Sequence, residues 1–529
     1  MNSKKRRTTK LLTKSKRHKP TLRNLCHIAV LHEEEQDLDE CLNELGNVMY
    51  KDDNVIQSCD DKKILGNNNN TINNDTMNND INIDIHNQIN QLPIVAPNVK
   101  LEMIRHTEVY KLSSFLLERV PNLRMPAFER WLIDSKMEEK CKKLGIDSDP
   151  ILSLLDMQTS MACQNLMEEI CEVNESRMDA ERIVSQLCDR ANRSVRYLNR
   201  LKSEEKGCLN RRCKILVEHD SLSVSLSLDR SKGKNKGNKN MKRQPFVVKL
   251  NRSHYQKLHL MYRNHLEGYS DTHTDDFTGP IEFYKQEHTF HMFVFALLIR
   301  YSALSGGQLL KDLRGGGMQG ALHDEVFDYL AQELGVKIEL FASPFNSFFS
   351  SYGSAFADLD RMFGSLGDFF NENNLLNNYI MKNGGCYECN PPFSPILMEL
   401  MVNRLELLLD RAKKCLQTLS FVIVVPSAAQ SGKSNSQVKM FAAKSFLKMI
   451  ESEFCRKHII LKARDHGYKE ASQHLRPTQF KESQYDTSVI ILSTKNLLND
   501  EKSFEEGLKL AFESKHKAET LQRKVLSKP

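Results

Sequence analysis

The chain has 529 residues, of which 40% are hydrophobic and 27% charged, a balance typical of a globular protein with about two to four domains. A membrane-spanning protein is excluded, because the longest strongly apolar run, Met292 to Ile299, ends at Arg300 and falls far short of the ~20 residues of a span. No apolar stretch follows the basic N-terminus, so no secretory signal is expected. The thirteen cysteines are scattered and odd in number, which favours free thiols in a reducing compartment.

Residues 1–95 are predicted to form a disordered basic and Asn-rich tail. Residues 1–23 hold ten Lys or Arg and no acid, so the formal charge of +7 becomes −3 without them. Two basic clusters, Lys4–Arg7 and Lys14–Arg17, indicate either a solvated end or a segment for nuclear import or nucleic-acid binding. Asparagine dominates residues 66–90, which cannot bury enough apolar surface to fold. The import interpretation places the protein in the nucleus.

Residues 96–310 are predicted to form a mostly α-helical domain. Apolar side chains recur there at helical spacing, for example at Leu112, Phe115, Leu116 and Val120. Residues 254–266 and 283–304 also favour helices, and Phe246 to Leu250 favours a short strand. The segment 231–244, rich in Lys, Gly and Asn, is predicted to be an exposed basic loop, either solvated or able to hold phosphates.

Residues 311–500 are predicted to form an α/β domain, and residues 501–529 a C-terminal helix with a basic tail. Helical and strand patterns alternate after the three glycines at 315–317. Strands are expected at 336–341, 385–389, 420–425 and 488–492, and helices at 326–333, 395–413 and 438–454. This alternation predicts a largely parallel sheet that binds its ligand where loops leave the carboxyl ends of the strands.

The tetrapeptide Asn390-Pro391-Pro392-Phe393 lies between a predicted strand and a predicted helix. Methyl transfer to the exocyclic amine of a base needs two acceptors aimed at the amine hydrogens, which the Asn390 side-chain oxygen and the Pro391 carbonyl would supply. The prolines stiffen the turn, and Phe393 offers a face on which a flipped-out base can stack. The alternative is that the tetrapeptide is simply a turn that starts a helix. The position of the tetrapeptide between a strand and a helix favours the methyltransferase interpretation.

A longer stretch of the sequence resembles one known family. Residues 335–349 read GVKIELFASPFNSFF, residues 352–360 read YGSAFADLD, residues 363–367 read FGSLG, and the NPPF turn follows. These segments, with HGYKEASQH at 466–474, resemble the phosphorylated CTD-interacting factor 1 family, the cap-specific adenosine N6-methyltransferases (CAPAM). The similarity spans roughly 98–500 and is strongest across 315–495.

The resemblance implies a Rossmann-like S-adenosylmethionine-dependent methyltransferase domain of the α/β class, packed against the N-terminal mostly α-helical domain. Its substrate would be capped mRNA, methylated at N6 of the adenosine or 2'-O-methyladenosine next to the 7-methylguanosine cap. The turn residues Asn390, Pro391, Pro392 and Phe393 would be catalytic and would also contact the cofactor, S-adenosylmethionine.

The same resemblance implies further site residues. The cofactor would lie against Phe341, Ala342, Ser343 and Pro344. Either Asp358 or Asp360 would bind its ribose hydroxyls, although an acid there would equally serve a local turn. The residues implied at the capped RNA are Tyr468, Gln473 and His474, which would otherwise belong to a satisfied surface loop.

Two departures from the family pattern carry expectations of their own. A WW domain needs two tryptophans and the chain has only Trp131, so no WW domain is expected and binding to the phosphorylated RNA polymerase II tail is not supported. Residues Pro426-Ser427-Ala428 stand where the family has Pro-Glu-Trp. The family's acid and aromatic side chain beside the substrate are therefore missing here. Their loss leaves open an alternative function, that of a catalytically weak or silent nuclear RNA-binding or scaffold relative.

Two further motifs resemble binding sites but are interpreted as parts of the fold. Gly432-Lys433-Ser434 resembles the end of a phosphate-binding loop, but Ser427 stands where the first glycine should be. Cys386 and Cys389 have no second ligand pair at zinc-site spacing. They are therefore predicted to be small buried hydrophobes, and no metal site is expected.

Overall fold

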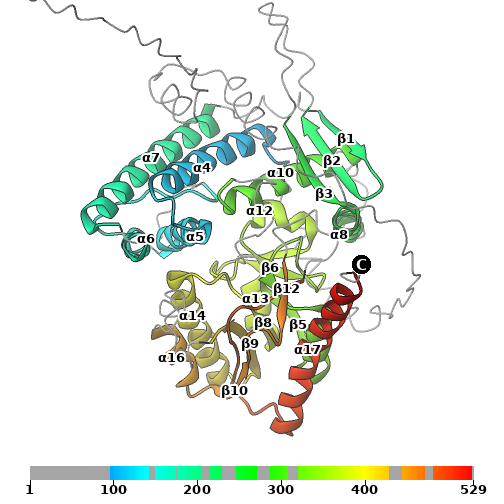
Figure 1. Cartoon of the computed structure of the whole chain (residues 1–529). Helices are drawn as coiled ribbons and strands as arrows, with labels where there is room; N and C mark the ends of the chain where they lie inside the picture. Colours follow the sequence, from blue (N-terminus) through cyan, green and yellow to red (C-terminus); the bar gives the residue numbers. More distant parts are fainter. Residues whose placement is uncertain are drawn as a thin grey trace, which may run out of the picture.

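The structure is a computed structural model of the chain, and it shows a mostly helical region, residues 96–307, beside an α/β region, residues 320–526 (Figure 1). It describes residues 96–141, 149–173, 175–204, 214–228, 246–270, 286–307, 320–427, 444–470 and 480–526. The predicted tail, the basic loop at 231–244, the motif at 432–434 and the predicted domain boundary at 310 all lie outside the described residues.

The helical region contains the helices that the apolar spacing predicts. They are α4 (Val99–Arg119), α5 (Met125–Cys141), α6 (Met161–Glu172), α7 (Arg177–Glu204), α8 (Arg252–Ser270) and α10 (Glu287–Leu304). The apolar run from Met292 to Ile299 lies within α10, where it is buried in the core of this region. Among the described helices, none combines the length and apolarity that crossing a membrane requires.

A small antiparallel sheet adjoins these helices. It consists of β1 (Ile215–His219), β2 (Ser223–Leu228) and β3 (Val247–Asn251), in that order. The strand predicted at 246–250 is confirmed as β3, whereas β1 and β2 were not predicted. In β2 the apolar residues are buried and alternate with half-buried serines, which is the period-two pattern of a strand with one face on the core.

The α/β region is built on a mixed seven-stranded sheet. In chain order its strands are β5 (Val336–Ala342), β6 (Tyr352–Ser354), β7 (Ser365–Gly367), β8 (Gly385–Cys389), β9 (Leu419–Pro426), β10 (Cys455–Leu461) and β13 (Thr487–Ser493). Their order across the sheet is β10-β13-β9-β8-β5-β6-β7. The five strands from β7 to β9 are parallel, but β13 runs antiparallel to both neighbours. The prediction of a largely parallel sheet holds for the five strands from β7 to β9. The antiparallel direction of β13 could not be predicted, because an apolar strand buried on both faces carries no signal of its direction.

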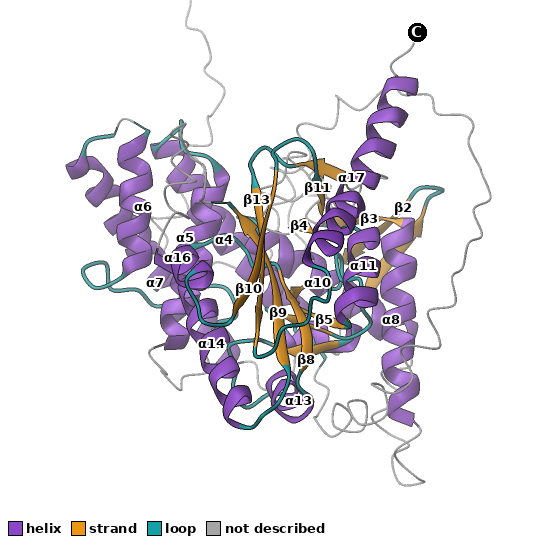
Figure 2. Ribbon diagram, turned by 90° about the horizontal axis from the view of Figure 1, so that it is seen from below, coloured by secondary structure: helices purple, strands orange, loops and turns teal. Residues whose placement is uncertain are grey.

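Helices cover both faces of this sheet, as Figure 2 shows with the sheet nearly edge-on. One face packs on α13 (Leu375–Asn383), α14 (Pro395–Lys414) and α16 (Lys444–Ile450), and the other on α11 (Asp324–Leu334) and α17 (Glu501–Leu526). The helix predicted to reach residue 454 stops earlier, at Ile450. There the Ser452 hydroxyl accepts the Phe454 N–H at 3.2 Å, a local bond that competes with helix continuation.

The order of the strands reverses between β5 and β8. From β5 the chain moves outward through β6 and β7, and then returns to the other side of β5 to form β8. Open α/β sheets bind ligands at this kind of reversal, outside the carboxyl ends of the strands. Loop residues at this edge, including Phe345, Phe356 and Met362, pack into the core of the helical region. The predicted site therefore lies where the two regions meet.

Candidate active site at the carboxyl edge of the sheet

The turn from Asn390 to Phe393 joins the end of β8 to the start of α14. The Asn390 amide is almost fully buried, and its Nδ2 donates to the carbonyl of Gly320 at 3.0 Å. This bond orients the amide, since the nitrogen is engaged and Oδ1 is the atom left to accept. Within the described part of the chain, neither Asn390 Oδ1 nor the Pro391 carbonyl accepts a hydrogen bond. The two acceptors that the sequence predicts are therefore available together.

Gly320 belongs to a second small sheet beside this turn. It lies in β4 (Gly320–Ala321), which pairs with β11 (Gly467–Glu470), and β11 pairs in turn with β12 (Phe480–Glu482). No sequence motif identifies Gly320 as a partner of Asn390. The two residues are 70 positions apart, and only the fold brings them together.

Phe393 is half-buried and has an aromatic neighbour that the sequence did not identify. Its ring and that of Tyr485 meet edge to face, with centroids 6.3 Å apart and an interplanar angle of 81°. Tyr485 lies just before β13 and belongs to none of the sequence motifs described above. Because aromatic faces stack on nucleobases irrespective of base identity, these two rings form a candidate platform for a flipped base.

The predicted cofactor residues lie at the end of β5 and in the loop that follows it: Phe341 and Ala342 are the last residues of the strand, and Ser343 and Pro344 begin the loop. The last three are buried, whereas Phe341 is half-buried and packs against Phe369. The Ser343 N–H and hydroxyl both donate to Asn346 Oδ1, at 2.7 and 2.8 Å. This pair of bonds closes the loop into a compact turn.

A lysine from the helical region holds the same loop. Lys257 of α8 donates through Nζ to the carbonyl oxygens of Ser347, at 2.7 Å, and Phe345, at 3.3 Å. Burial, helped by the charge of Lys469, lowers the pKa of Lys257 to about 7. Neither Asn346 nor Lys257 belongs to a recognisable motif, so sequence reasoning missed both.

Two buried glutamates lie side by side on β5 and β8. Glu339 and Glu388 are register partners, and Glu339 accepts the backbone N–H groups of Phe348 and Phe349 at 2.7 and 3.1 Å. Burial raises the pKa of Glu339 to about 7, and burial with the neighbouring Glu339 raises the pKa of Glu388 well above its ordinary value. Within the described residues, Glu388 Oε1 is buried with no hydrogen-bond partner. A bound group that carries an N–H or O–H donor would satisfy it.

The structure separates the two candidate aspartates that follow β6. Asp358, at the start of α12 (Ala357–Asp360), has a side chain that is 59% exposed. Asp360 is fully buried and accepts from the Tyr301 hydroxyl at 2.8 Å and the Phe356 N–H at 3.3 Å. Burial raises the pKa of Asp360 to about 7. Asp360 therefore has the local structural role, and Asp358 is the acid accessible to a ligand.

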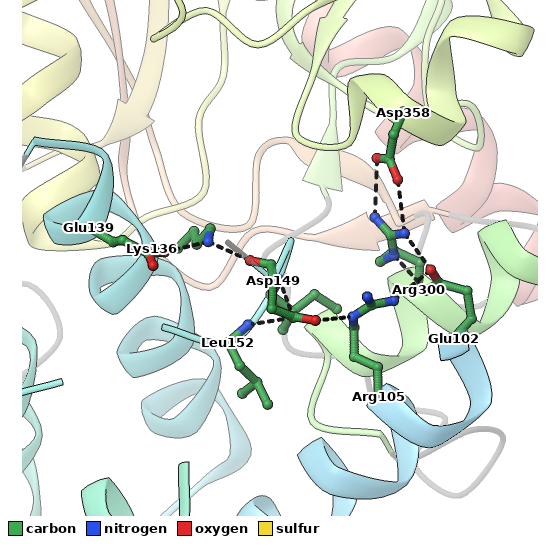
Figure 3. A network of polar contacts seen from close by, with 9 residues as sticks. Glu102, Arg105, Lys136, Glu139, Asp149, Leu152, Arg300 and Asp358 are labelled. Atoms are coloured by element: carbon green, nitrogen blue, oxygen red, sulfur yellow. Dashed lines mark hydrogen bonds and ion pairs between the residues drawn. The ribbon is translucent and has the colours of Figure 1, made fainter. Parts of the chain in front are cut away.

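An arginine from the core of the helical region orients Asp358. Figure 3 shows Arg300 of α10 between Asp358 and Glu102, a buried residue of α4. Arg300 donates to Glu102 through Nε at 2.6 Å and Nη2 at 2.5 Å. Burial opposes ionisation of Glu102, but Arg105 and Arg300 outweigh it and lower the pKa of Glu102 to about 2. The Glu102 carboxylate and the Arg300 guanidinium are therefore charged at neutral pH.

The predicted RNA contacts receive little support from the described residues. Tyr468, on β11, is buried in an apolar cluster, and its hydroxyl bonds Thr487 Oγ1 at 2.7 Å. It is neither an exposed RNA contact nor part of a surface loop, because its strand packs against the main sheet. Gln473 and His474 lie outside the described residues. At the altered rim, the Ser427 N–H donates to the Asp486 carbonyl at 2.7 Å, and Ala428 lies outside the described residues.

The interpretation of Cys386 and Cys389 as buried hydrophobes is confirmed. Both lie on β8, and they belong to apolar clusters on opposite faces of the sheet. Residues three apart on a strand point in opposite directions. The two thiols therefore cannot bind one metal ion together.

Comparison with known proteins adds a family and two relatives. Residues 257–471 match the family model described as the phosphorylated CTD interacting factor 1 WW domain. Two proteins, one from Mus musculus and one from Homo sapiens, are each named mRNA (2'-O-methyladenosine-N(6)-)-methyltransferase and are 32% identical to this chain over 248 residues. The alignment covers 46% of this chain, which spans only 30% of the length of each relative.

The family match contradicts the prediction that the chain lacks the family's WW domain. That prediction rested on the single tryptophan, Trp131, which lies outside the matched residues. Residues 257–471 contain no tryptophan and still match the model that carries the WW description. Counting tryptophans was therefore not a valid test. The match and the two relatives together support the resemblance of this chain to the phosphorylated CTD-interacting factor 1 family.

Proposed function

We propose that this chain is an S-adenosylmethionine-dependent RNA methyltransferase of the phosphorylated CTD-interacting factor 1 family. Its substrate is the adenosine, or 2'-O-methyladenosine, next to the 7-methylguanosine cap of mRNA, and the methyl group goes to N6. One observation carries the proposal: the Nδ2 of Asn390 is bonded to the Gly320 carbonyl, so Oδ1 and the Pro391 carbonyl remain as acceptors in a stiff strand-to-helix turn. The names of the two similar proteins support the substrate class.

The proposed mechanism relies on positioning. The N6 lone pair of adenine is delocalised into the ring, so the amine is a weak nucleophile. Asn390 Oδ1 and the Pro391 carbonyl accept the two amine hydrogens and draw the nitrogen toward a tetrahedral, more nucleophilic state. Phe393, with Tyr485 beside it, stacks on the flipped base and holds the amine at this pair of acceptors. Preorganised acceptors of this kind need no rearrangement during the reaction.

The strand order supports a Rossmann-like methyltransferase fold. If β5 counts as the first strand and β13 is set aside, the order across the sheet reads 3-2-1-4-5-6, as in doubly wound sheets. In such sheets the ligand lies at the reversal between strands 1 and 4, which are β5 and β8 here. That reversal carries the loops with Ser343 and Asn390.

The residues at this reversal fit S-adenosylmethionine, which when bound supplies an electrophilic methyl group on a sulfonium. Asp358 has free carboxylate surface for the two ribose hydroxyls while Arg300 holds it. Glu388 Oε1, buried without a partner among the described residues, can accept an N–H of the ammonium group. The end of β5 and the loop after it, from Phe341 to Pro344, are proposed to lie against the cofactor. Asp358 rather than Asp360 is proposed for the ribose, because the Asp360 carboxyl is fully buried and its Oδ2 already accepts from Tyr301 and Phe356.

We place the protein in the nucleus, on the strength of the basic clusters at Lys4–Arg7 and Lys14–Arg17. Capped mRNA is the proposed partner. We propose Gln473 and His474 as contacts to the RNA. Tyr468 is not proposed as a contact, because its side chain is buried.

A second candidate function is that of a catalytically weak or silent RNA-binding relative with the same fold. The observation that favours it is Ser427, which stands where the family has an acid, with the aromatic position beyond it changed to Ala428. Of these two changed residues, Ser427 directly follows β9 at the carboxyl edge of the sheet. The two changes would weaken the hold on the capped nucleotide rather than remove the acceptors at Asn390 and Pro391.

Methyl transfer from labelled S-adenosylmethionine to short RNAs that begin with adenosine, with and without a 7-methylguanosine cap, separates these functions. Label on the capped RNA alone, and none with Asn390→Ala, is the expected result. Label on both RNAs would retain the chemistry and reject the cap requirement. A folded protein that is thermally stabilised by S-adenosylmethionine but labels neither RNA would favour the silent relative.

A further inference from the structure

The helical region holds each of four successive loops at the carboxyl edge of the sheet. The loops after β5, β6, β7 and β8 each bond one charged side chain from that region. The four pairs are Lys257 with Ser347, Arg300 with Asp358, Lys140 with Asp368, and Asp134 with Ser394. The first three pairs hold loops around the proposed cofactor site. The fourth reaches the segment that directly follows the catalytic turn.

Asp134 makes this contact from α5. Its carboxyl is 1% exposed, and its Oδ1 accepts both the Ser394 hydroxyl and, at 3.1 Å, the Ile396 N–H. Ser394 is fully buried as well. The two residues are 260 positions apart, so the contact is purely tertiary.

The contact replaces a missing helix cap. The first N–H groups of a helix have no partner inside it, and an N-terminal serine usually supplies one with its own side chain. Ser394 is the N-cap of α14 but makes no capping bond, and Pro395 has no N–H to offer. Asp134 takes the capping position instead and accepts the Ile396 N–H. The start of α14 is therefore capped by a residue of α5 and not by a side chain of its own.

The bond from Asp134 limits how far the catalytic turn can move. Strand pairing of β8 holds the turn at Asn390, and Asp134 holds it four residues later at Ser394. The Ser394 N–H also donates back to the Pro392 carbonyl at 2.9 Å. Without Asp134 the far end of the turn would keep its own backbone bond and the apolar packing of Ile396 and Leu397 on α5, but it would lose the hydrogen bonds to Asp134. A displacement of about 1 Å at a reacting centre can cost about 10²-fold in rate.

We propose that Asp134 is a positioning residue for methyl transfer: it caps α14 from another helix and thereby sets the direction of the Asn390 and Pro391 acceptors. This inference rests on the proposed methyltransferase function and deepens it. Asp134 touches neither substrate nor cofactor. Its removal is therefore expected to lower kcat while the affinities for S-adenosylmethionine and RNA stay close to those of the wild type.

The test compares kcat, the RNA KM and thermal stabilisation by S-adenosylmethionine in the full chain. Asp134→Ala is expected to lower kcat about 10²-fold, with the RNA KM and the stabilisation by cofactor within about twofold of the wild type. Asp134→Asn keeps an oxygen for the Ile396 N–H and should recover most of kcat. Ser394→Ala should lower kcat about tenfold, and the Asp134→Ala/Ser394→Ala double variant should be no slower than Asp134→Ala alone, because the two side chains act as one unit.

The matched control is Arg130→Met, also on α5. Arg130 is buried like Asp134, but it pairs with Glu169 of α6 and not with the turn. This variant can lose stability but should keep its kcat. A general effect of disturbing α5 would lower kcat in Arg130→Met as well, and that result would overturn the inference.

Two other results would also overturn it. Wild-type kcat in Asp134→Ala would do so directly. If Asp134→Ala does not fold, Ser394→Ala decides, and an unchanged kcat in that variant rejects the positioning role. Absence of methyl transfer by the folded wild type is a distinct outcome, because it would overturn the proposed function and this inference together.

Discussion

Arg300 donates from both terminal guanidinium nitrogens to the two carboxylate oxygens of Asp358, at 3.2 and 3.0 Å. Arg300 is buried in α10, whereas Asp358 is exposed at the start of α12. The pair therefore links the core of the helical region to the loop after β6. A carboxylate held in this two-point manner keeps further lone pairs for another donor.

The first prediction concerns cofactor binding by Asp358. Asp358→Ala should weaken binding of S-adenosylmethionine about tenfold, because hydrogen bonds from the ribose to a charged acceptor are lost. Isothermal titration of the cofactor measures this change. Asp328→Ala, at an exposed position on α11, is the control and should bind as the wild type does. Equal affinities in all three proteins would rule out a ribose contact at Asp358.

The second prediction uses the raised pKa of Asp360. Burial raises this pKa from 3.8 to about 7 in the folded state, so the folded protein binds the proton more tightly than the unfolded chain does. The contribution of this carboxyl to stability is fully present below about pH 4 and is lost as the pH rises through about 7. Asp360→Asn, which carries no titratable group, should show a smaller fall in the free energy of unfolding between pH 4 and pH 8. Urea unfolding at both pH values measures it, and equal falls would contradict the assignment.

The third prediction concerns the stability of the Glu102–Arg300 pair. Arg300→Met should destabilise the fold by about 3 kcal/mol, because it removes one of the two arginines that compensate the buried Glu102 carboxylate and leaves Arg105 as the other. Adding Glu102→Gln should recover part of this loss. The control is Arg182→Met, which breaks an exposed pair with Asp179 and should cost no more than about 1 kcal/mol. Denaturant unfolding gives all these values, and similar losses for the two arginines would be evidence against the buried network.

The fourth prediction tests the catalytic amide. Asn390→Ala should lower methyl transfer at least about 10²-fold, since it removes one of two preorganised acceptors, while thermal stabilisation by S-adenosylmethionine persists. Asn383→Ala removes an exposed amide near the end of α13 and serves as the control. Wild-type rates in Asn390→Ala would show that the amide is not part of the reaction.

The fifth prediction concerns the aromatic platform. Phe393→Ala should raise the RNA KM about tenfold or more, because stacking on a base contributes about 1–3 kcal/mol. Phe393→Tyr keeps the ring and should stay near the wild-type KM. Steady-state kinetics with varied RNA concentration measures both. A KM that does not respond to loss of the ring would place the base elsewhere.

Much of the fold follows from local pattern. The strands at 385–389 and 420–425 and the helix at 395–413 were predicted within one residue of β8, β9 and α14, because each is a short apolar run or an amphipathic repeat between turn residues. The very short strands β6 and β7 have too few residues for a period to show. They exist because β5 offers hydrogen-bond partners to β6, and β6 in turn offers them to β7.

The sequence also carries the proposal for the chemistry of the turn. Asn390 and Phe393 lie together in it because they are neighbours in the chain, and the stiffness of the turn comes from the two prolines between them. The sequence could not distinguish Asp358 from Asp360. That distinction depends on which carboxyl is buried against Tyr301 and which one Arg300 holds at the surface.

The partners of the site residues were decided by tertiary structure alone. Gly320, Tyr485 and Asp134 are each remote in sequence from the turn that they contact. Hydrogen bonds and ring contacts of this kind depend on which strands and helices pack together. Periodicity marks the buried face of an element but does not identify its remote partner. The residue types of the proposed methyl-transfer turn are thus visible in the chain itself. Their tertiary partners come from both regions, with Gly320 on β4 and Asp134 on α5.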